Sequence, residues 1–124
     1  MRALEPLAGL RVVAEPTALD DARWQGDEVT VLRFAPDDAF AIGAEGVGVD
    51  DEHAIVEPDA GYSGAWVAIG DVAHHVEWSI PHQRPALAQG SIAGVPAKLW
   101  LPDDGPALLL TATAYADELT GRLR

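Results

Sequence analysis

Alternating and continuous apolar stretches divide the chain into segments that favour short strands and a few helices. Runs rich in β-branched or large apolar side chains predict strands at 10–14, 28–34, 39–42, 65–69, 71–80, 95–101 and 107–112. Turn residues at 36–38 and at 102–105 separate two pairs of these runs, and each pair is therefore expected to form a hairpin. Residues 58–64 also have turn chemistry.

Helical patterns are fewer and shorter. Thr17 is expected to cap a helix that ends before Gly26, and residues 85–90 favour at most a short helix. The clearest helix lies at the C-terminus, where Thr113 can act as the N-cap and acidic residues precede arginines, as the helix dipole favours. Its apolar positions recur four residues apart, at Tyr115, Leu119 and Leu123.

The segment 43–53 is expected to be an exposed loop, because it contains three glycines and four acidic residues. We therefore interpret residues 1–124 as a single domain with a possible division into two units, 1–50 and 54–124. Each unit combines returning strands with one or two short helices. The predicted fold class is α+β, with two β-rich units and short helices packed on one face of a mostly antiparallel sheet.

Composition narrows the function classes. The chain has 20 acidic and 8 basic residues, for a net charge of −12, and residues 1–62 hold 14 of the acids. Such a surface repels a phosphate backbone, so we expect no nucleic-acid partner. No apolar run is long enough for a membrane span or a signal peptide, which predicts a cytoplasmic protein without a membrane partner. The lack of cysteine excludes disulfides and thiolate chemistry.

Two short motifs suggest chemistry, and both have simpler explanations. His74 and His75 are adjacent, and on the predicted strand their side chains would point to opposite faces, which argues against a shared metal ion. Residues 61–65 come near the G-x-S-x-G motif of serine hydrolases, but Ala65 replaces the last glycine and the context is a turn. We therefore predict no catalytic residue and no metal ligand.

Four tryptophans, at positions 24, 66, 78 and 100, are many for a chain of this size. Core packing explains some of them, but indoles are also the usual anchors of contact surfaces. We expect a ligand or partner surface in the second half of the chain, made by Tyr62, Trp66, His74, His75, Trp78 and Trp100.

Several segments of the second half resemble, in order, the gamma subunit of heterotetrameric sarcosine oxidase and the related folate-binding domain of the glycine cleavage T protein. Residues 71–80 (DVAHHVEWSI) are similar to the family's Asp-Val-Ser-His strand, and 87–90 (LAQG) to the end of a helix. Residues 92–100, 108–110 and 114–119 follow in the family's order, and 32–42 resemble one of its hairpins. Ala73 replaces the family's serine, and only residues 81–90 fill a gap that is normally longer.

The resemblance implies a non-catalytic accessory subunit, docked on a flavin-dependent, folate-linked amine-oxidising partner of one-carbon metabolism. The flavin would belong to that partner, no cofactor would be bound by this chain itself, and tetrahydrofolate is a ligand that the resemblance allows. The T protein's catalytic aspartate motif has no counterpart here, so the resemblance does not imply an enzyme acting alone. The alternative is a free-standing module that binds a folate-like or other aromatic molecule. A homo-oligomer is the other partner that the tryptophans would suit.

Overall fold

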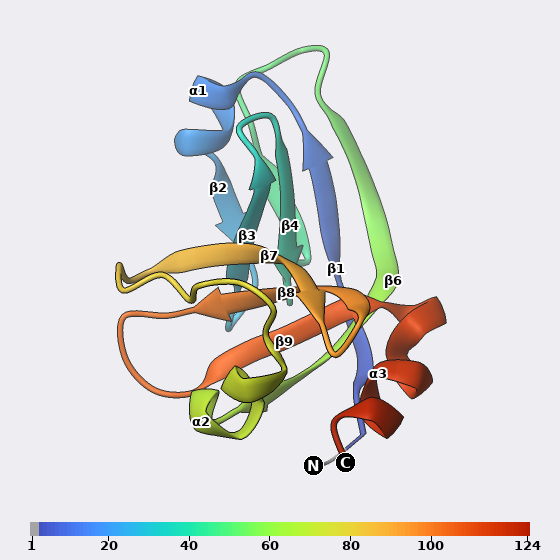
Figure 1. The fold of residues 1–124 in the computed structure, drawn as a ribbon. Helices are drawn as coiled ribbons and strands as arrows, with labels where there is room; N and C mark the ends of the chain where they lie inside the picture. The colour runs from blue at the N-terminus through green and yellow to red at the C-terminus, as the bar shows by residue number, and fades with distance from the viewer. Residues whose placement is uncertain (1–2) are drawn as a thin grey trace. The chain divides into compact units, whose positions relative to one another are not determined.

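A computed structural model describes residues 3–124 and shows a β-rich chain with a few short helices (Figure 1). The strands are β1 (Glu5–Val13), β2 (Arg23–Gln25), β3 (Thr30–Ala35), β4 (Asp38–Ile42), β5 (Gly46–Gly48), β6 (Ile55–Val67), β7 (Ala86–Ile92), β8 (Val95–Leu101) and β9 (Ala107–Ala112). The helices are α1 (Pro16–Asp20), α2 (Ile69–Val72), α3 (Ala116–Arg122) and the 3-10 turns η1 (Ala73–His75) and η2 (Thr113–Tyr115). Among residues 3–124, no helix is long and apolar enough to cross a membrane.

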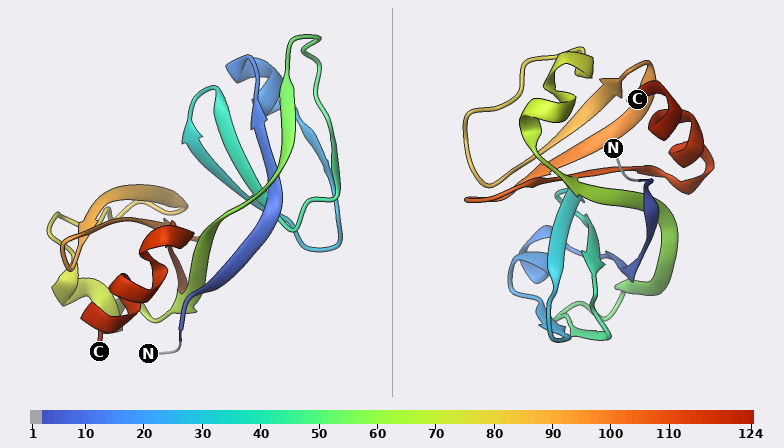
Figure 2. Two further views of the ribbon diagram at one scale, coloured as in Figure 1. Left: turned by 90° about the vertical axis from the view of Figure 1, so that its right-hand side faces the viewer. Right: turned by 90° about the horizontal axis from the view of Figure 1, so that it is seen from below.

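The chain divides into two compact units. The N-terminal unit is Leu7–Ala60, and the C-terminal unit contains residues 3–6 together with Gly61–Arg124. The N-terminal unit thus ends inside β6, at Ala60, and not in the glycine-rich segment 43–53. Strands β1 and β6 each continue from one unit into the other (Figure 2).

In the N-terminal unit, β4 is the central strand, because β3 and β1 both pair with it in antiparallel register. Phe40 of β4 lies opposite Arg11 on one side and Leu32 on the other. Strands β2 and β5 form a separate antiparallel pair. One apolar cluster of this unit is formed by the buried residues Val12, Ala14, Leu19 and Ala39, with Leu10, Trp24, Val31, Val47, Val49 and Ala54 packed against them.

The C-terminal unit is a four-stranded antiparallel sheet in the order β6-β9-β8-β7. Alternate residues of each strand point to one face, and on β8 these are the buried Val95, Ala97, Leu99 and Leu101. Val72 of α2 and Leu119 of α3 are completely buried in the same cluster. The helical segments of this unit therefore pack against a single face, which we call the core face. The face opposite to it is called the outer face.

Both predicted hairpins are confirmed. Residues 36 and 37 connect β3 to β4, and residues 102–106 connect β8 to β9. The predicted strand at 10–14 corresponds to the end of β1, which begins earlier, at Glu5.

The predicted N-terminal helix and glycine-rich loop need correction. Helix α1 covers only Pro16–Asp20, its N-cap is Glu15 rather than Thr17, and β2 occupies part of the segment before Gly26. The segment 43–53 contains β5, whose three residues are half-buried. The strands β2 and β5 thus form where part of a helix and a loop were predicted. They are stable there because each strand provides hydrogen-bond partners for the backbone of the other.

The predicted turn at 58–64 is wrong, because β6 runs through all of it without interruption. From Tyr62 to Val67, the strand is paired residue by residue with β9. Pro58 lies in the exposed part of this strand, where a missing N–H can be tolerated.

The predicted strand at 71–80 is also wrong. Ile69 and Val72 lie in α2, and a hydrogen bond of 2.9 Å from the Asp71 N–H to the Ala68 carbonyl closes its first turn. The apolar residues 69, 72 and 76 are three and four positions apart, which is a helical spacing, and residues 72 and 76 also fit an alternating pattern. Only Val76 forms a β-bridge, with Ile92.

Residues 86–90 form most of β7 and not a helix. All seven residues of β7 pair with β8, from Ala86 opposite Leu101 to Ile92 opposite Val95. The two strands are joined by a two-residue turn in which Ala93 and Gly94 both have positive φ, 50° and 79°. Mirror-image turns of this kind join hairpin strands, and here pairing overrides the weak strand preference of alanine and glycine.

The C-terminal helix is confirmed as α3, preceded by η2, but its predicted cap and face are not. Thr113 makes no capping hydrogen bond. Leu119 and Leu123 are buried, whereas Tyr115 is 43% exposed. Tyr115 lies in η2 rather than α3, so the four-residue spacing does not place it on the buried face of the helix.

Candidate functional site

A cavity of about 400 Å³ opens on the C-terminal unit, and its walls come from all four strands and from η2. Tyr62 of β6 and Tyr115 of η2 both line it, and they are the two tyrosines of the chain. Pro96 and Ala112 add apolar surface. Polar groups come from Gln89, Ser91 and Lys98, of which Lys98 is the only lysine in the sequence.

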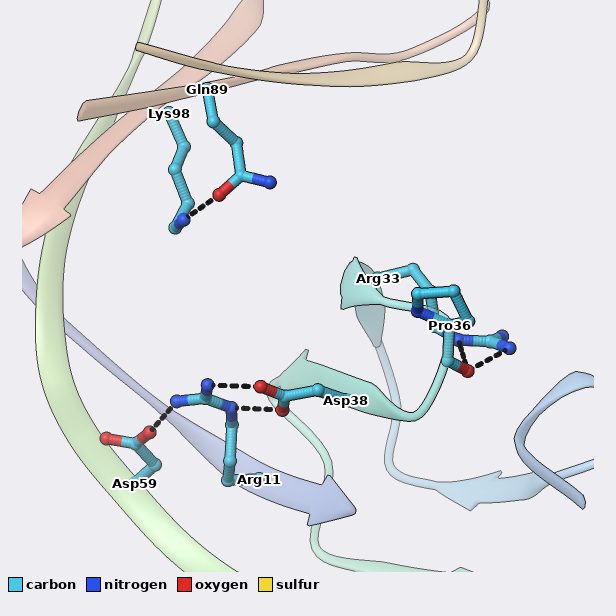
Figure 3. A network of polar contacts seen from close by, with 7 residues as sticks. All are labelled: Arg11, Arg33, Pro36, Asp38, Asp59, Gln89 and Lys98. Atoms are coloured by element: carbon cyan, nitrogen blue, oxygen red, sulfur yellow. Dashed lines mark hydrogen bonds and ion pairs between the residues drawn. The ribbon is translucent and has the colours of Figure 1, made fainter. Parts of the chain in front are cut away.

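Strand register explains why these side chains converge. Directly opposed residues of an antiparallel sheet have their side chains on the same face. Tyr62 is opposite Ala112, and Lys98 is opposite Gln89. These four positions are on the outer face, since the alternate residues of their strands form the core. The Lys98 ammonium donates a hydrogen bond to the side-chain oxygen of Gln89, drawn in Figure 3.

A row of large apolar residues crosses the same outer face. Leu108 of β9 lies opposite Trp66 of β6 on one side and opposite Trp100 of β8 on the other, and Leu87 of β7 lies opposite Trp100. Trp66 is 49% exposed, and Trp100 is half-buried. Trp66 follows Tyr62 by four residues on β6, so the row lies roughly 13 Å from the tyrosine along the strand.

Trp78 has a different environment from the other two indoles. It is half-buried against the core cluster, and a Cβ added at Gly90 would lie 2.2 Å from its Nε1 atom. The Nε1 atom is buried and has no hydrogen-bond partner among residues 3–124. Trp78 is therefore a packing residue over β7, and the absence of a side chain at position 90 is what lets the indole approach.

His74 and His75 lie side by side in η1, with ring centroids 4.0 Å apart and an interplanar angle of 42°. The expectation that they point to opposite faces of a strand is therefore wrong, and His74 is exposed. Within residues 3–124, no group of three or more His, Asp or Glu side chains is placed to hold a metal ion.

The serine of the hydrolase-like motif is inaccessible. Ser63 is 1% exposed, and its hydroxyl shares a hydrogen bond of 2.9 Å with that of Thr113. A nucleophile needs both access to substrate and an adjacent base. The contact of Ser63 instead ties β6 to the start of η2, which carries Tyr115.

A second cavity, of about 540 Å³, belongs to the N-terminal unit and is acidic. Its wall includes Glu15, Asp37 and Asp51, together with the exposed His53. The Asp51 carboxylate accepts hydrogen bonds of 2.9 Å from the backbone N–H groups of Glu15 and His53, and these bonds lower its pKa. Asp51 thus has a structural role, in which it holds the segment before α1.

The six residues expected to form one surface are in fact divided among three places. Tyr62 lines the first cavity, Trp66 and Trp100 form the row on the same face, and the two histidines with Trp78 belong to the segment after α2. Sequence reasoning missed Gln89, Lys98 and Tyr115. The alternation along β8, which places Lys98 opposite to the core positions, was the available indication.

Comparison with known proteins adds no family or relative to what the geometry of the site shows. On the outer face, the cavity and the exposed indole of Trp66 offer surface to a ligand or partner, whereas Leu108 beside Trp66 is only 1% exposed. No protein-family model matches this chain, and no curated protein or solved structure matches it either.

Proposed function

We propose that this chain is a small-ligand binding module and that its ligand occupies the cavity of the C-terminal unit. The observation that carries the proposal is the composition of the cavity wall, in which two tyrosines and apolar surface surround the polar groups of Gln89, Ser91 and Lys98. Ligand sites are typically concave, largely apolar and supplied with a few convergent polar groups. The volume of about 400 Å³ falls in the range of such sites.

A non-catalytic role fits this geometry. Ser63 is buried and already hydrogen-bonded, and the wall of the cavity holds neither an acidic residue nor a histidine among residues 3–124. A lysine and two tyrosines can orient a bound molecule through hydrogen bonds and ring contacts. The module would therefore retain or present its ligand. We propose that it does so in the cytoplasm.

The test is a titration of the full-length chain, labelled with ¹⁵N, against a mixed set of neutral, cationic and anionic small molecules. Tetrahydrofolate belongs in the set because of the sarcosine oxidase gamma resemblance, and its binding would also quench tryptophan fluorescence. We expect saturable shifts of the backbone amides at positions 62, 89, 98 and 115. Ala112→Trp should fill the cavity and abolish these shifts, whereas Asp104→Trp, in the exposed turn before β9, should not. A set in which no molecule shifts these amides would contradict the proposal.

A second candidate function is the accessory subunit that the resemblance implies, docked on a flavin-dependent, amine-oxidising partner. The observation that favours it is Trp66, an indole left 49% exposed beside Leu108 and in line with Trp100. Exposed indoles are common anchors of protein interfaces. Two of the segments that carry the resemblance, 71–80 and 87–90, have other secondary structure than the family pattern implies, so this candidate stands second.

Copurification tests the accessory role. The untagged chain, isolated from its own cells, should retain a large subunit with the visible absorption of an oxidised flavin, and Trp66→Ser should release it. Recovery as a single chain would contradict docking. Recovery as an assembly of identical chains would instead identify the outer face as a contact between copies.

A further inference from the structure

We propose that the N-terminal unit docks a basic segment of another protein in its cavity of about 540 Å³, where β1 ends and β6 begins. This cavity, which we call the acidic hollow, is lined by residues 13–16, 36, 37, 51, 53 and 55. Val13 and Ile55 would contact an apolar side chain of the partner. The carboxylates of Glu15, Asp37 and Asp51 would face its lysines or arginines. The inference does not depend on the ligand proposed for the C-terminal unit.

Apolar side chains are exposed to solvent in the acidic hollow. Of the five large apolar side chains that are exposed among residues 3–124, Val13 and Ile55 both line it. Val13 is 40% exposed, and Ile55 is 56% exposed. Pro16 and Pro36 are also exposed and add apolar surface. Exposed apolar surface with polar groups at its rim is typical of contact sites.

The charge around the acidic hollow is negative. Residues 7–60 hold 13 acidic and 3 basic side chains. Each of the three arginines forms an ion pair with carboxylates that do not line the hollow: Arg11 with Asp38 and Asp59, Arg23 with Asp50, and Arg33 with Asp20. Glu15 and Asp37 are exposed, and no lysine or arginine of residues 3–124 lines the hollow beside them. A cationic partner therefore complements this surface.

Hydrogen bonds between segments hold the wall of the acidic hollow in place. Figure 1 shows α1, the turn between β3 and β4 and the start of β6 at the same end of the unit. The Ala14 N–H donates a bond of 3.1 Å to the Asp37 carbonyl. The Arg33 guanidinium donates bonds of 3.1 and 2.8 Å to the carbonyls of Pro16 and Pro36. A surface that is already ordered loses little conformational entropy when it binds a partner.

A basic protein segment suits the acidic hollow better than other occupants. A second copy of this chain has a net charge of −12 and would be repelled, and so would a nucleic acid. A small cation would be poorly enclosed, because every lining residue except Ala14 and Asp51 is exposed. Lysine and arginine combine a charge with an apolar stem, which matches a surface that has both characters.

The experiment titrates the full-length, ¹⁵N-labelled chain with three synthetic peptides. The first has lysines on both sides of a central leucine, the second has serine in place of the leucine, and the third has glutamates in place of the lysines. We expect the first peptide to shift the amides at positions 13, 15, 37, 53 and 55 saturably. It should bind about ten-fold more tightly than the second, because leucine buries apolar surface. The third should not bind, and added salt should weaken the first.

Two double variants test the charge. Glu15→Gln with Asp37→Asn should weaken binding of the leucine peptide by about three- to ten-fold, because two exposed ion pairs are lost. The Glu15 side chain makes no capping bond, so this change should leave α1 in place. Asp27→Asn with Glu28→Gln is the control. It removes the same charge from exposed positions of the same unit outside the hollow, and the affinity should change by less than about two-fold.

Ile55→Ser and Val56→Ser test the apolar contact. Successive residues of a strand point to opposite faces, and of these two exposed side chains only Ile55 lines the acidic hollow. Ile55→Ser should therefore remove most of the preference for the leucine peptide over the serine peptide, whereas Val56→Ser should retain it. Because both side chains are exposed, we expect both variants to fold.

Several results would overturn the proposal. Equal affinity for the leucine and serine peptides, or equal losses in the two double variants, would indicate attraction to the overall negative charge. Butylammonium that shifts the same amides with the affinity of the leucine peptide would identify a small cation as the ligand. Shifts of these amides when the chain alone is concentrated would identify a second copy. The absence of any shift with the leucine peptide would also contradict docking.

Discussion

The guanidinium of Arg11 on β1 donates two hydrogen bonds of 2.7 Å, from Nε and Nη2, to the two carboxylate oxygens of Asp38 on β4. Its Nη1 donates a third, of 3.3 Å, to Asp59 on β6 (Figure 3). Its Cζ lies 4.8 Å from the centre of the Phe34 ring. The paired side chains of Arg11 and Asp38 are only 29% and 25% exposed. A single arginine thus links three strands of the N-terminal unit.

Arg11→Met should therefore destabilise the protein by about 1–2 kcal/mol, because it leaves two half-buried carboxylates without their cation. The free energy of unfolding, measured by urea denaturation, reports the loss. Arg23→Met is the matched control. Arg23 pairs with Asp50 at 3.3 Å, but these side chains are 63% and 77% exposed, so we expect a change below about 0.5 kcal/mol. Equal effects of the two substitutions would contradict a special role for Arg11.

Gly90→Ala should destabilise the C-terminal unit by about 1–3 kcal/mol, because the new methyl group would collide with the Trp78 indole. The tryptophan emission spectrum should change as well, since the ring must move. Gly121→Ala is the control. Nothing lies within 4 Å of a Cβ at that position in α3, and alanine favours helix, so its stability should stay equal or rise slightly.

Ala93→Gly should stabilise the protein by about 0.5–1 kcal/mol. Ala93 has φ of 50° in the turn between β7 and β8, and a left-handed conformation is costly for any residue with a Cβ. Ala114→Gly, in η2 with no positive φ, should have the opposite sign, because glycine there only increases the entropy of the unfolded chain. Thermal unfolding of the two variants gives the comparison. A lower melting temperature for Ala93→Gly would refute the mirror-image turn.

These turns and contacts show where sequence reasoning succeeded. The β3–β4 and β8–β9 hairpins were predictable because apolar runs flank Pro-Asp turn residues, so local chemistry and long-range pairing agree. The buried pattern of β8 was equally readable, since alternate residues from Val95 to Leu101 form the core. The packing of helices on one face, predicted from the returning strands, is found in the C-terminal unit, where Val72 and Leu119 join the core cluster.

Sequence reasoning failed where pairing partners decided the structure. The seven residues of β7 include two alanines and a glycine, and they form a strand because every one of them pairs with β8. Segment 71–80 satisfied two periodicities, and the helical one prevailed at 69–72. The cavity was not predictable as a unit, because its wall depends on the register of four strands that no local pattern specifies.

Lowering the pH should selectively break the contact between the Asp51 carboxylate and Glu15, the N-cap of α1. The two backbone N–H bonds that lower the pKa of Asp51 favour its charged form in the folded state. The stabilisation is therefore complete above the ordinary pKa of 3.8 and is lost as the pH falls through the lower, folded-state value. An NMR titration of the Asp51 carboxyl carbon should have its midpoint below 3.8, with the Glu15 and His53 amides shifting in parallel. In Asp51→Asn, these amides should no longer respond to that transition.

The C-terminal unit is made of two segments that are far apart in the sequence, and this affects how the chain folds during synthesis. Leu4, which is synthesised before the N-terminal unit, is buried with Leu109, Leu119 and Leu123, which are synthesised after it. Residues 7–60 form the N-terminal unit in between, so this unit can become compact before Leu4 finds its partners. A fragment that starts at residue 61 would lack Leu4. Neither a truncated gene nor proteolysis can therefore yield the C-terminal unit as one continuous segment of chain.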